Sequence, residues 1–382
     1  MLTGEYVRPF YHSTKSPKYR RGPKLLTALF SILALLALVH FLIVMHTSNT
    51  QAVAPATCSH LIRNTDYTKY IQFDPNSQQV GAIQYVDLLM GGQPAALVQV
   101  MDTQHTLDVY IYGCLMQHAT PTLTVLFKHQ GLAQGTVSMS KANTLILGER
   151  DTALSPDATA VLHPLQQNLY QEYRWQNGIF AQVLFPGLYP VSNRSEAEAL
   201  QEQANNGESL PWNDPQVTAE QMAKDILQWS SGGYQEKTLD TNGTTAHILL
   251  EQNSPEMAVT VTLTRVIQGD AKGLWFVTKA QTQNITLDQS RFPVPVTSPI
   301  ALHGTVTTTD GQATATLFDH TLTAMSSLNN TMLSISPSTS YTGSMLYTNN
   351  KQTQQGLLLI ENIPPSKSSE AGQLLLTNVL LG

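Results

Sequence analysis

Hydrophobic and polar positions divide this chain of 382 residues into stretches of different periodicity. Residues 25–45 are continuously apolar, whereas from about residue 58 onward apolar and polar positions mostly alternate, which is the period of a half-buried β-strand. Apolar positions three and four residues apart, the period of a helix, return between residues 191 and 230. The pattern predicts a mainly β protein with an α+β middle, preceded by one transmembrane helix.

The apolar run "LLTALFSILALLALVHFLIVM", residues 25–45, contains no Lys, Arg, Asp or Glu. As a helix rising about 1.5 Å per residue, it is roughly 30 Å long, which matches the hydrocarbon core of a bilayer. A helix packed on a soluble core would carry a polar side, and here the polar positions are Thr27, Ser31 and His40. We therefore expect a single transmembrane helix over residues 25–45.

The charges that flank this run predict its orientation. Six Lys or Arg residues and one acid, Glu5, precede the run, and no Lys or Arg follows it until Arg63. Because positive flanks stay in the cytoplasm, we expect a cytoplasmic tail over residues 1–24, a polar linker over residues 46–57 and an extracytoplasmic remainder. A cleaved signal peptide remains an alternative, since Ala52-Val53-Ala54 offers small residues to a peptidase, although signal apolar regions are usually about 7–15 residues long. A soluble core helix is the other alternative.

Residues 58–190 show the pattern of a β-meander domain. The segments "GAIQYVDLL", "LDVYIYGCL" and "TLTVLFKHQG" alternate in polarity and are separated by turn-forming residues such as "MGGQP" and "QHATP". Asn177-Gly178 predicts a tight hairpin turn within a later aromatic-rich stretch.

Residues 191–283 predict a small α+β domain. Ser195 with Glu198, and Thr218 with Gln221, have the spacing of capping boxes at two helix starts. The strand-like segments "AHILLEQ", "MAVTVTLTRVI" and "GLWFVTKAQTQ" follow. Two helices followed by an antiparallel sheet resemble, over a short stretch, the NTF2-like domains of bacterial envelope proteins.

Residues 284–382 carry about six strand-like segments, close to the size and strand count of an immunoglobulin-like β-sandwich. The segments "VTSPIALHG", "YTGSMLYT" and "GLLLIENIPPSKSSEAGQLLLTNVLLG" resemble the immunoglobulin-like domain of bacterial sporulation and germination proteins. After Gly304 the chain reads "TVTTTDGQATATLFDH", where that family often has an aromatic residue paired with Glu. The resemblance implies an extracytoplasmic, non-enzymatic accessory role.

Two cysteines, Cys58 and Cys114, both follow the apolar run. Outside the cytoplasm a disulfide can persist, so we expect a bridge between them, with two independent thiols as the alternative. The bridge would close a loop of roughly 57 residues and stabilise the fold by about 4 kcal/mol in the chain-entropy description.

Composition limits the candidate chemistry. Charged residues make up 13% of the chain, the net charge is −6 and no basic run occurs outside the N-terminus, which argues against a nucleic-acid partner. The chain contains no H-E-x-x-H, C-x-x-C or G-x-S-x-G motif. We expect no catalytic residue, no cofactor and no metal site.

These expectations describe a single-pass protein of the bacterial cell membrane that binds or scaffolds an envelope protein or wall polymer. The alternative is an envelope enzyme such as a cell-wall hydrolase, whose paired carboxylates need not be close in sequence. A transmembrane signalling regulator is disfavoured, because a cytoplasmic tail of about 24 residues is too short to fold as a domain.

Overall fold

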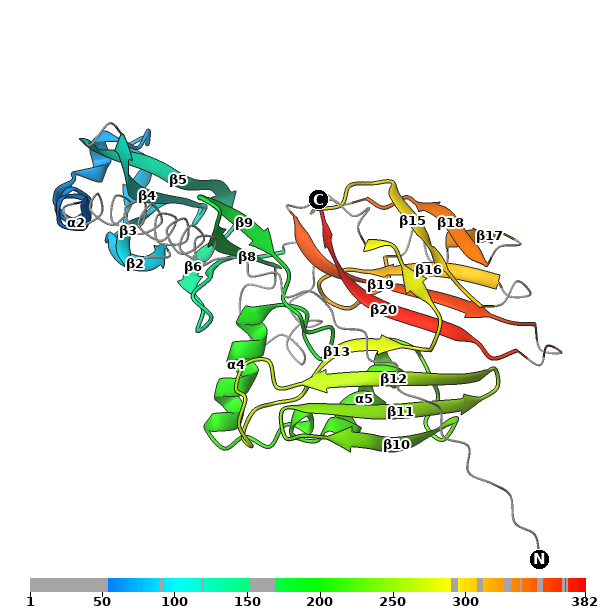
Figure 1. Ribbon diagram of the computed structural model, residues 1–382. Helices are drawn as coiled ribbons and strands as arrows, with labels where there is room; N and C mark the ends of the chain where they lie inside the picture. The colour runs from blue at the N-terminus through cyan, green and yellow to red at the C-terminus, as the bar shows by residue number, and fades with distance from the viewer. Residues whose placement is uncertain are drawn as a thin grey trace, which may run out of the picture. The chain divides into compact units, whose positions relative to one another are not determined.

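A computed structural model gives the fold of the chain (Figure 1). It describes residues 54–89, 92–117, 120–151, 169–289, 295–307, 312–325, 331–336, 339–348, 353–365, 368 and 370–382. By compactness the chain divides into residues 1–57 and residues 58–382. The predicted transmembrane helix at residues 25–45 lies outside the described ranges, and within those ranges no helix is both long enough and apolar enough to span a bilayer. The predicted β-rich character is confirmed.

A five-stranded antiparallel sheet forms the first part of the described chain. Its order is β1-β3-β4-β5, and β2 also pairs with β3. A helix absent from the sequence expectation, α2 (Ala54–Asn64), begins inside the predicted linker and precedes a short 3₁₀ turn, η1 (Tyr67–Lys69). The strands are β1 (Gln78–Val80), β2 (Gln84–Leu89), β3 (Gln93–Asp102), β4 (Leu107–Gln117) and β5 (Thr120–Leu132).

Both faces of this sheet are covered, and alternation along β4 decides which side chains go to which face. Tyr110, Tyr112 and Cys114 join a core with α2 residues such as Ile62, whereas Ile111, which lies between the two tyrosines, joins the opposite core. The second core lies against a four-stranded sheet of order β6-β7-β8-β9. Its strands are β6 (Thr136–Met139), β7 (Leu145–Glu149), β8 (Leu169–Gln176) and β9 (Ile179–Val183).

The predicted hairpin turn at Asn177-Gly178 is confirmed between β8 and β9. Both residues have positive φ angles, 53° and 84°, which is the backbone of a type I′ turn and the reason that Asn and Gly stand there.

Helix α5 lies across one face of the next four strands, and α4 stands beside them and contributes to the same core (Figure 1). The helices are α4 (Arg194–Asn205) and α5 (Pro215–Asp225), with the short turn η2 (Pro211–Asn213) between them. The strands are β10 (Tyr234–Thr241), β11 (Thr245–Asn253), β12 (Glu256–Thr264) and β13 (Phe276–Gln281). Alternate residues of β11 and β12 are buried beneath the helices, which explains the period-two pattern of their sequences.

Both predicted helix caps are wrong by a few residues. The N-cap of α4 is Asn193, whose side chain accepts a hydrogen bond from the Glu196 N–H, and the N-cap of α5 is Asp214, followed by Pro215. Ser195 and Thr218 lie inside the helices instead. Asn and Asp cap as well as Ser and Thr do, and Pro suits the first helical position, so several adjacent polar residues competed for each cap.

The C-terminal strands form a sandwich-like arrangement around a core of their own. They are β14 (Thr286–Leu287), β15 (Ile300–Thr305), β16 (Gln312–Phe318), β17 (Thr331–Ile335), β18 (Ser340–Met345), β19 (Gln354–Ile363) and β20 (Gln373–Leu381). Strands β15, β17 and β18 face β16, β19 and β20 across this core.

Strand β13 pairs with β20, so the sheet formed by β10–β13 continues into the C-terminal strands. The eleven strands run in the order β10-β11-β12-β13-β20-β19-β16-β17-β18-β15-β14. Leu357 and Leu359 of β19 face the helix-side core while Leu358 and Ile360 face the sandwich core. Burial on both faces explains why residues 357–360 of β19, "LLLI", are continuously apolar rather than alternating. Residues 283 and 284, where we expect the boundary between the second and third parts, lie in the turn between β13 and β14.

Candidate functional site

The predicted disulfide is present. Cys58 of α2 and Cys114 of β4 are bonded, their Cα atoms are 5.4 Å apart, and both side chains are buried. This Cα separation is ordinary for a disulfide. The bond joins α2 to the central part of the five-stranded sheet and closes most of the first part of the chain into one loop.

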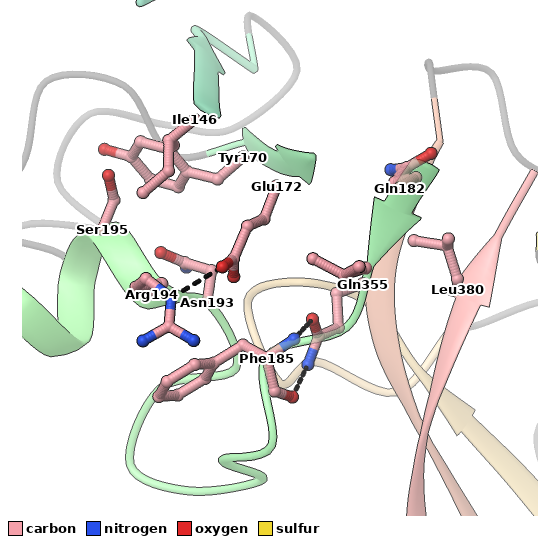
Figure 2. A pocket seen from close by; sticks show the side chains of 11 residues that line it. Ile146, Tyr170, Glu172, Gln182, Phe185, Asn193, Arg194, Ser195, Gln355 and Leu380 are labelled. Atoms are coloured by element: carbon pink, nitrogen blue, oxygen red, sulfur yellow. Dashed lines mark hydrogen bonds and ion pairs between the residues drawn. The ribbon is translucent and has the colours of Figure 1, made fainter. Parts of the chain in front are cut away.

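Buried polar contacts from three parts of the chain converge on the segment that joins β9 to α4 (Figure 2). We call this region the junction and define it by Glu172 of β8, Phe185, Asn193, Arg194 and Gln355 of β19. Its members are far apart in sequence, and the structure brings them together around the connecting segment.

An ion pair forms the first contact of the junction. Arg194 Nε donates to Glu172 Oε1 at 2.7 Å, and the Thr144 hydroxyl donates to the same oxygen at 2.7 Å. The side chains of Arg194 and Glu172 are only 11% and 7% exposed, so this pair belongs to the interior. A buried pair contributes little net stability compared with apolar residues, but the loss of one member leaves the other charge uncompensated.

The start of α4 places Arg194 in this position. Asn193 Oδ1 accepts from the Glu196 N–H at 2.9 Å, and Asn193 Nδ2 donates to Glu196 Oε2 at 2.7 Å, which fixes the first turn. A cation in the first turn opposes the helix dipole. The Glu172 carboxylate offsets that penalty, since it lies beside the guanidinium at the same helix end. Arg194 also lies over the Phe185 ring, with Cζ 5.3 Å from the ring centroid.

The backbone of Phe185 is held by the C-terminal strands. Its N–H donates to Gln355 Oε1 at 2.9 Å, and its carbonyl accepts from Gln355 Nε2 at 2.8 Å. Asn378 Nδ2 of β20 donates to the same carbonyl at 2.8 Å. One side-chain amide therefore satisfies both polar groups of a buried residue, which is what a backbone segment outside any sheet requires.

The cavity enclosed by the junction is about 10 Å³, which is close to the space that one water molecule occupies. Burial, and next the neighbouring Glu196 carboxylate, raise the pKa of Tyr170, which also lines the cavity. The cavity is too small to enclose an organic substrate. The geometry of the junction therefore supports a structural role, in which its contacts join β8, α4 and β19.

A larger open groove of about 470 Å³ lies where the exposed face of β11 and β12 meets the start of β20. Its lining is mostly hydroxyl, amide and small apolar groups, with Glu370 as its acid. The lining residues are Leu249, Ala258, Thr260, Thr282, Gln283, Asn284, Thr307, Glu370, Ala371, Gly372 and Gln373.

Sequence reasoning identified Cys58 and Cys114 but missed the junction. Glu172 lies in the alternating stretch "LYQEYRWQ". Tyr170, two residues before it and on the same face of the strand, is also buried. An acid at an inward strand position was therefore a signal that the carboxylate has a buried partner, but nothing local identifies Arg194 as that partner.

Within the described ranges, no group of three or more His, Cys, Asp and Glu side chains has the geometry to hold a metal ion. In comparisons with known proteins, the chain matches no protein-family model, no curated protein and no solved structure.

Proposed function

We propose that this chain is a single-pass protein of the bacterial cell envelope whose extracytoplasmic part binds or scaffolds another envelope component. The observation that carries the proposal is the order of features at its N-terminus. A basic tail and an apolar run of bilayer length precede a buried Cys58–Cys114 disulfide, and a disulfide persists in an oxidising compartment.

The junction supports a scaffolding role. It joins the four-stranded sheet, the start of α4 and strands β19 and β20 through buried charge-assisted and amide hydrogen bonds. Directional contacts of this kind favour one relative arrangement of the parts that they join. A protein that presents several binding surfaces at fixed separations needs such a feature.

The neutral groove beside Gln373 supports a ligand that is rich in hydroxyl or amide groups, such as a wall glycan. Thr260, Gln283 and Asn284 offer donors and acceptors that can bond such a ligand without burying a charge. The sporulation and germination link implied by "VTSPIALHG" and the terminal strands belongs to the same proposal.

Topology tests the first part of the proposal. The full chain, produced in a bacterium with an intact envelope, is treated with protease after removal of the outer wall. We expect residues 58–382 to be cleaved and a fragment containing residues 1–45 to stay with the membrane. Release of a mature chain that lacks residues 1–54 into the medium would show that the apolar run is a cleaved signal.

Polymer binding tests the second part. We expect the detergent-solubilised full chain to co-sediment with purified wall polymer, and Ala258→Trp to reduce that binding by filling the groove. Ile179→Trp, an exposed change on β9 outside the groove, is the matched control. Hydrolysis of the polymer by the wild-type chain would overturn the binding role in favour of an enzyme.

A further inference from the structure

The face of the five-stranded sheet that α2 covers carries a group of exposed aromatic and apolar side chains. We call it the α2 face. Among the described residues, twelve large apolar side chains are exposed, and four of them lie here: Tyr70, Tyr85, Met116 and Val125. Tyr70 is 59% exposed and Val125 is 46% exposed.

Strand register places these four side chains around one surface. Val125 pairs with Tyr112, and Tyr85 pairs with Ala96, and both partners belong to the core beneath α2. Tyr70 packs edge-on against Tyr112, with ring centroids 6.5 Å apart. Met116 lies beside the disulfide, with its sulfur 4.0 Å from Cys58 Sγ.

Exposed cations are interleaved with these side chains. The Arg63 guanidinium lies 5.2 Å from the Tyr85 ring centroid, and Lys128 Nζ lies 5.7 Å from that of Tyr110. Lys69, next to Tyr70, is 75% exposed and reaches Asp66 at 3.4 Å. Two acids share the face with these cations, Asp66 beside Lys69 and Asp108, whose carboxylate bonds the same Gln130 amide as the Tyr110 hydroxyl, so the face is mixed in charge.

Tyr side chains together with Lys and Arg are the residues that concentrate where a protein meets the headgroup region of a bilayer. Their apolar parts enter the boundary of the acyl chains while the hydroxyl or charged end stays in water. The α2 face carries both Tyr and basic side chains, and its rings are held in place by the packing of the sheet.

The chain length between the apolar run and α2 brings a bilayer within reach of this face. Eight residues, 46–53, separate Met45 from the first residue of α2, Ala54. Even fully extended, at roughly 3.5 Å per residue, they span no more than about 28 Å. If residues 25–45 are inserted in the membrane, this short connection therefore keeps α2 close to the extracytoplasmic surface of that membrane.

We propose that the α2 face docks on the lipid surface of the membrane in which residues 25–45 are anchored. This inference rests on the proposed single-pass topology. Docking orients the first sheet against the headgroups and directs the exposed end of the β8–β9 hairpin, on the opposite sheet, away from them.

Fluorescent labelling of the full chain in vesicles of phosphatidylcholine and phosphatidylglycerol tests the inference. The native cysteines are bonded, so single cysteines can be introduced for an environment-sensitive dye. Val125→Cys reports on the α2 face, Ile179→Cys is the matched control on β9, where the side chain is 61% exposed, and Ser31→Cys reports on the apolar run. Spin-labelled lipids and aqueous iodide are the quenchers.

We expect the dye at residue 125 to shift its emission to shorter wavelength and to be quenched by shallow spin labels, while the dye at residue 179 stays accessible to iodide. Lys69→Glu combined with Lys128→Glu should weaken the shift at residue 125. Equal responses at residues 125 and 179 would overturn docking. So would protection from iodide at residue 125 without lipid quenching, because a protein would then cover the face.

The label at residue 31 separates the two proposals. If it lies in the bilayer while residue 125 stays in water, docking fails and the anchor stands. If the labels at residues 31 and 125 both stay in water, the anchor proposal fails, and docking fails with it.

Discussion

Arg194 Nε and Glu172 Oε1 lie 2.7 Å apart in the protein interior, one in the first turn of α4 and the other on β8. Because both charges are largely removed from water, each depends on the other. The pair links the four-stranded sheet to α4, which shares a core with β10–β13.

Arg194→Met should destabilise the protein strongly, because it leaves the Glu172 carboxylate buried without its cation. We expect a loss of about 3–5 kcal/mol, measured by urea unfolding of the detergent-solubilised chain. Adding Glu172→Gln should restore part of that loss, since the double variant buries no lone charge. Arg174→Met, at an exposed position on β8, the strand that carries Glu172, is the control. An Arg194→Met variant as stable as this control would contradict the role of the pair.

Replacing Gln355 by Leu should free the N–H of Phe185 from its partner. The expected loss is about 1–3 kcal/mol, the cost of an unsatisfied buried polar group. Asn378→Ala should cost less, because the Phe185 carbonyl keeps its bond from Gln355. Limited proteolysis of the segment between β9 and α4 provides the second measurement, with cleavage faster in Gln355→Leu. A larger loss of stability in Asn378→Ala than in Gln355→Leu would show that the Gln355 amide is not the main contact that holds the Phe185 backbone.

Removal of the disulfide in the double variant Cys58→Ala, Cys114→Ala should lower stability by about 4 kcal/mol, the value expected for the loop that the bond closes. Thermal unfolding with and without reductant checks this. Reductant should lower the melting temperature of the wild-type chain and leave that of the double variant unchanged. If reductant leaves the melting temperature of the wild-type chain unchanged, the disulfide does not contribute to its stability.

Stability should fall as pH rises from about 4.5 to about 7 because of Glu236 on β10. A hydrogen bond shared with Glu220, then burial, then the charges of Glu220 and Asp214 raise the pKa of Glu236 from 4.5 to about 7. The folded state therefore holds this proton more tightly than the unfolded state. Its contribution is complete below about pH 4.5 and is lost as pH rises through 7.

Glu236→Gln should consequently be more stable than the wild type above pH 7, with a difference that shrinks toward pH 4.5. Since the side chain is exposed, screening limits the gain to about 1 kcal/mol or less. Melting temperatures across this pH range provide the measurement, and Glu251→Gln, at an exposed position on the neighbouring strand, is the control. A pH-independent difference would rule out the shared proton.

Local features were largely readable from the sequence. Period-two alternation indicated β11 and β12, and Asn177-Gly178 indicated a hairpin, because each depends on neighbouring residues only. The helix caps were not readable in this way, because several adjacent polar residues can act as the cap. Asn193 and Ser195 both satisfy the chemistry of an N-cap, and the reciprocal bond from Asn193 to Glu196 decided between them.

Long-range relationships were not readable in the same way. The pairing of β13 with β20 joins residues nearly a hundred positions apart, and no local pattern specifies which strand a given edge will meet. The α2 helix was also missed, since its sequence "APATCSHLIRN" is weakly apolar and its stability comes from the disulfide and the core beneath it.

By itself, the sequence determined the β-rich character, the hairpin turn and the candidate disulfide partners, because alternation, turn chemistry and cysteine count act through composition and near neighbours. The tertiary structure alone decided that Glu172 meets Arg194, that Gln355 holds Phe185 and that aromatic and basic side chains share the α2 face. Each of these depends on which elements pack together, and packing is settled by the burial of the whole chain rather than by any one segment.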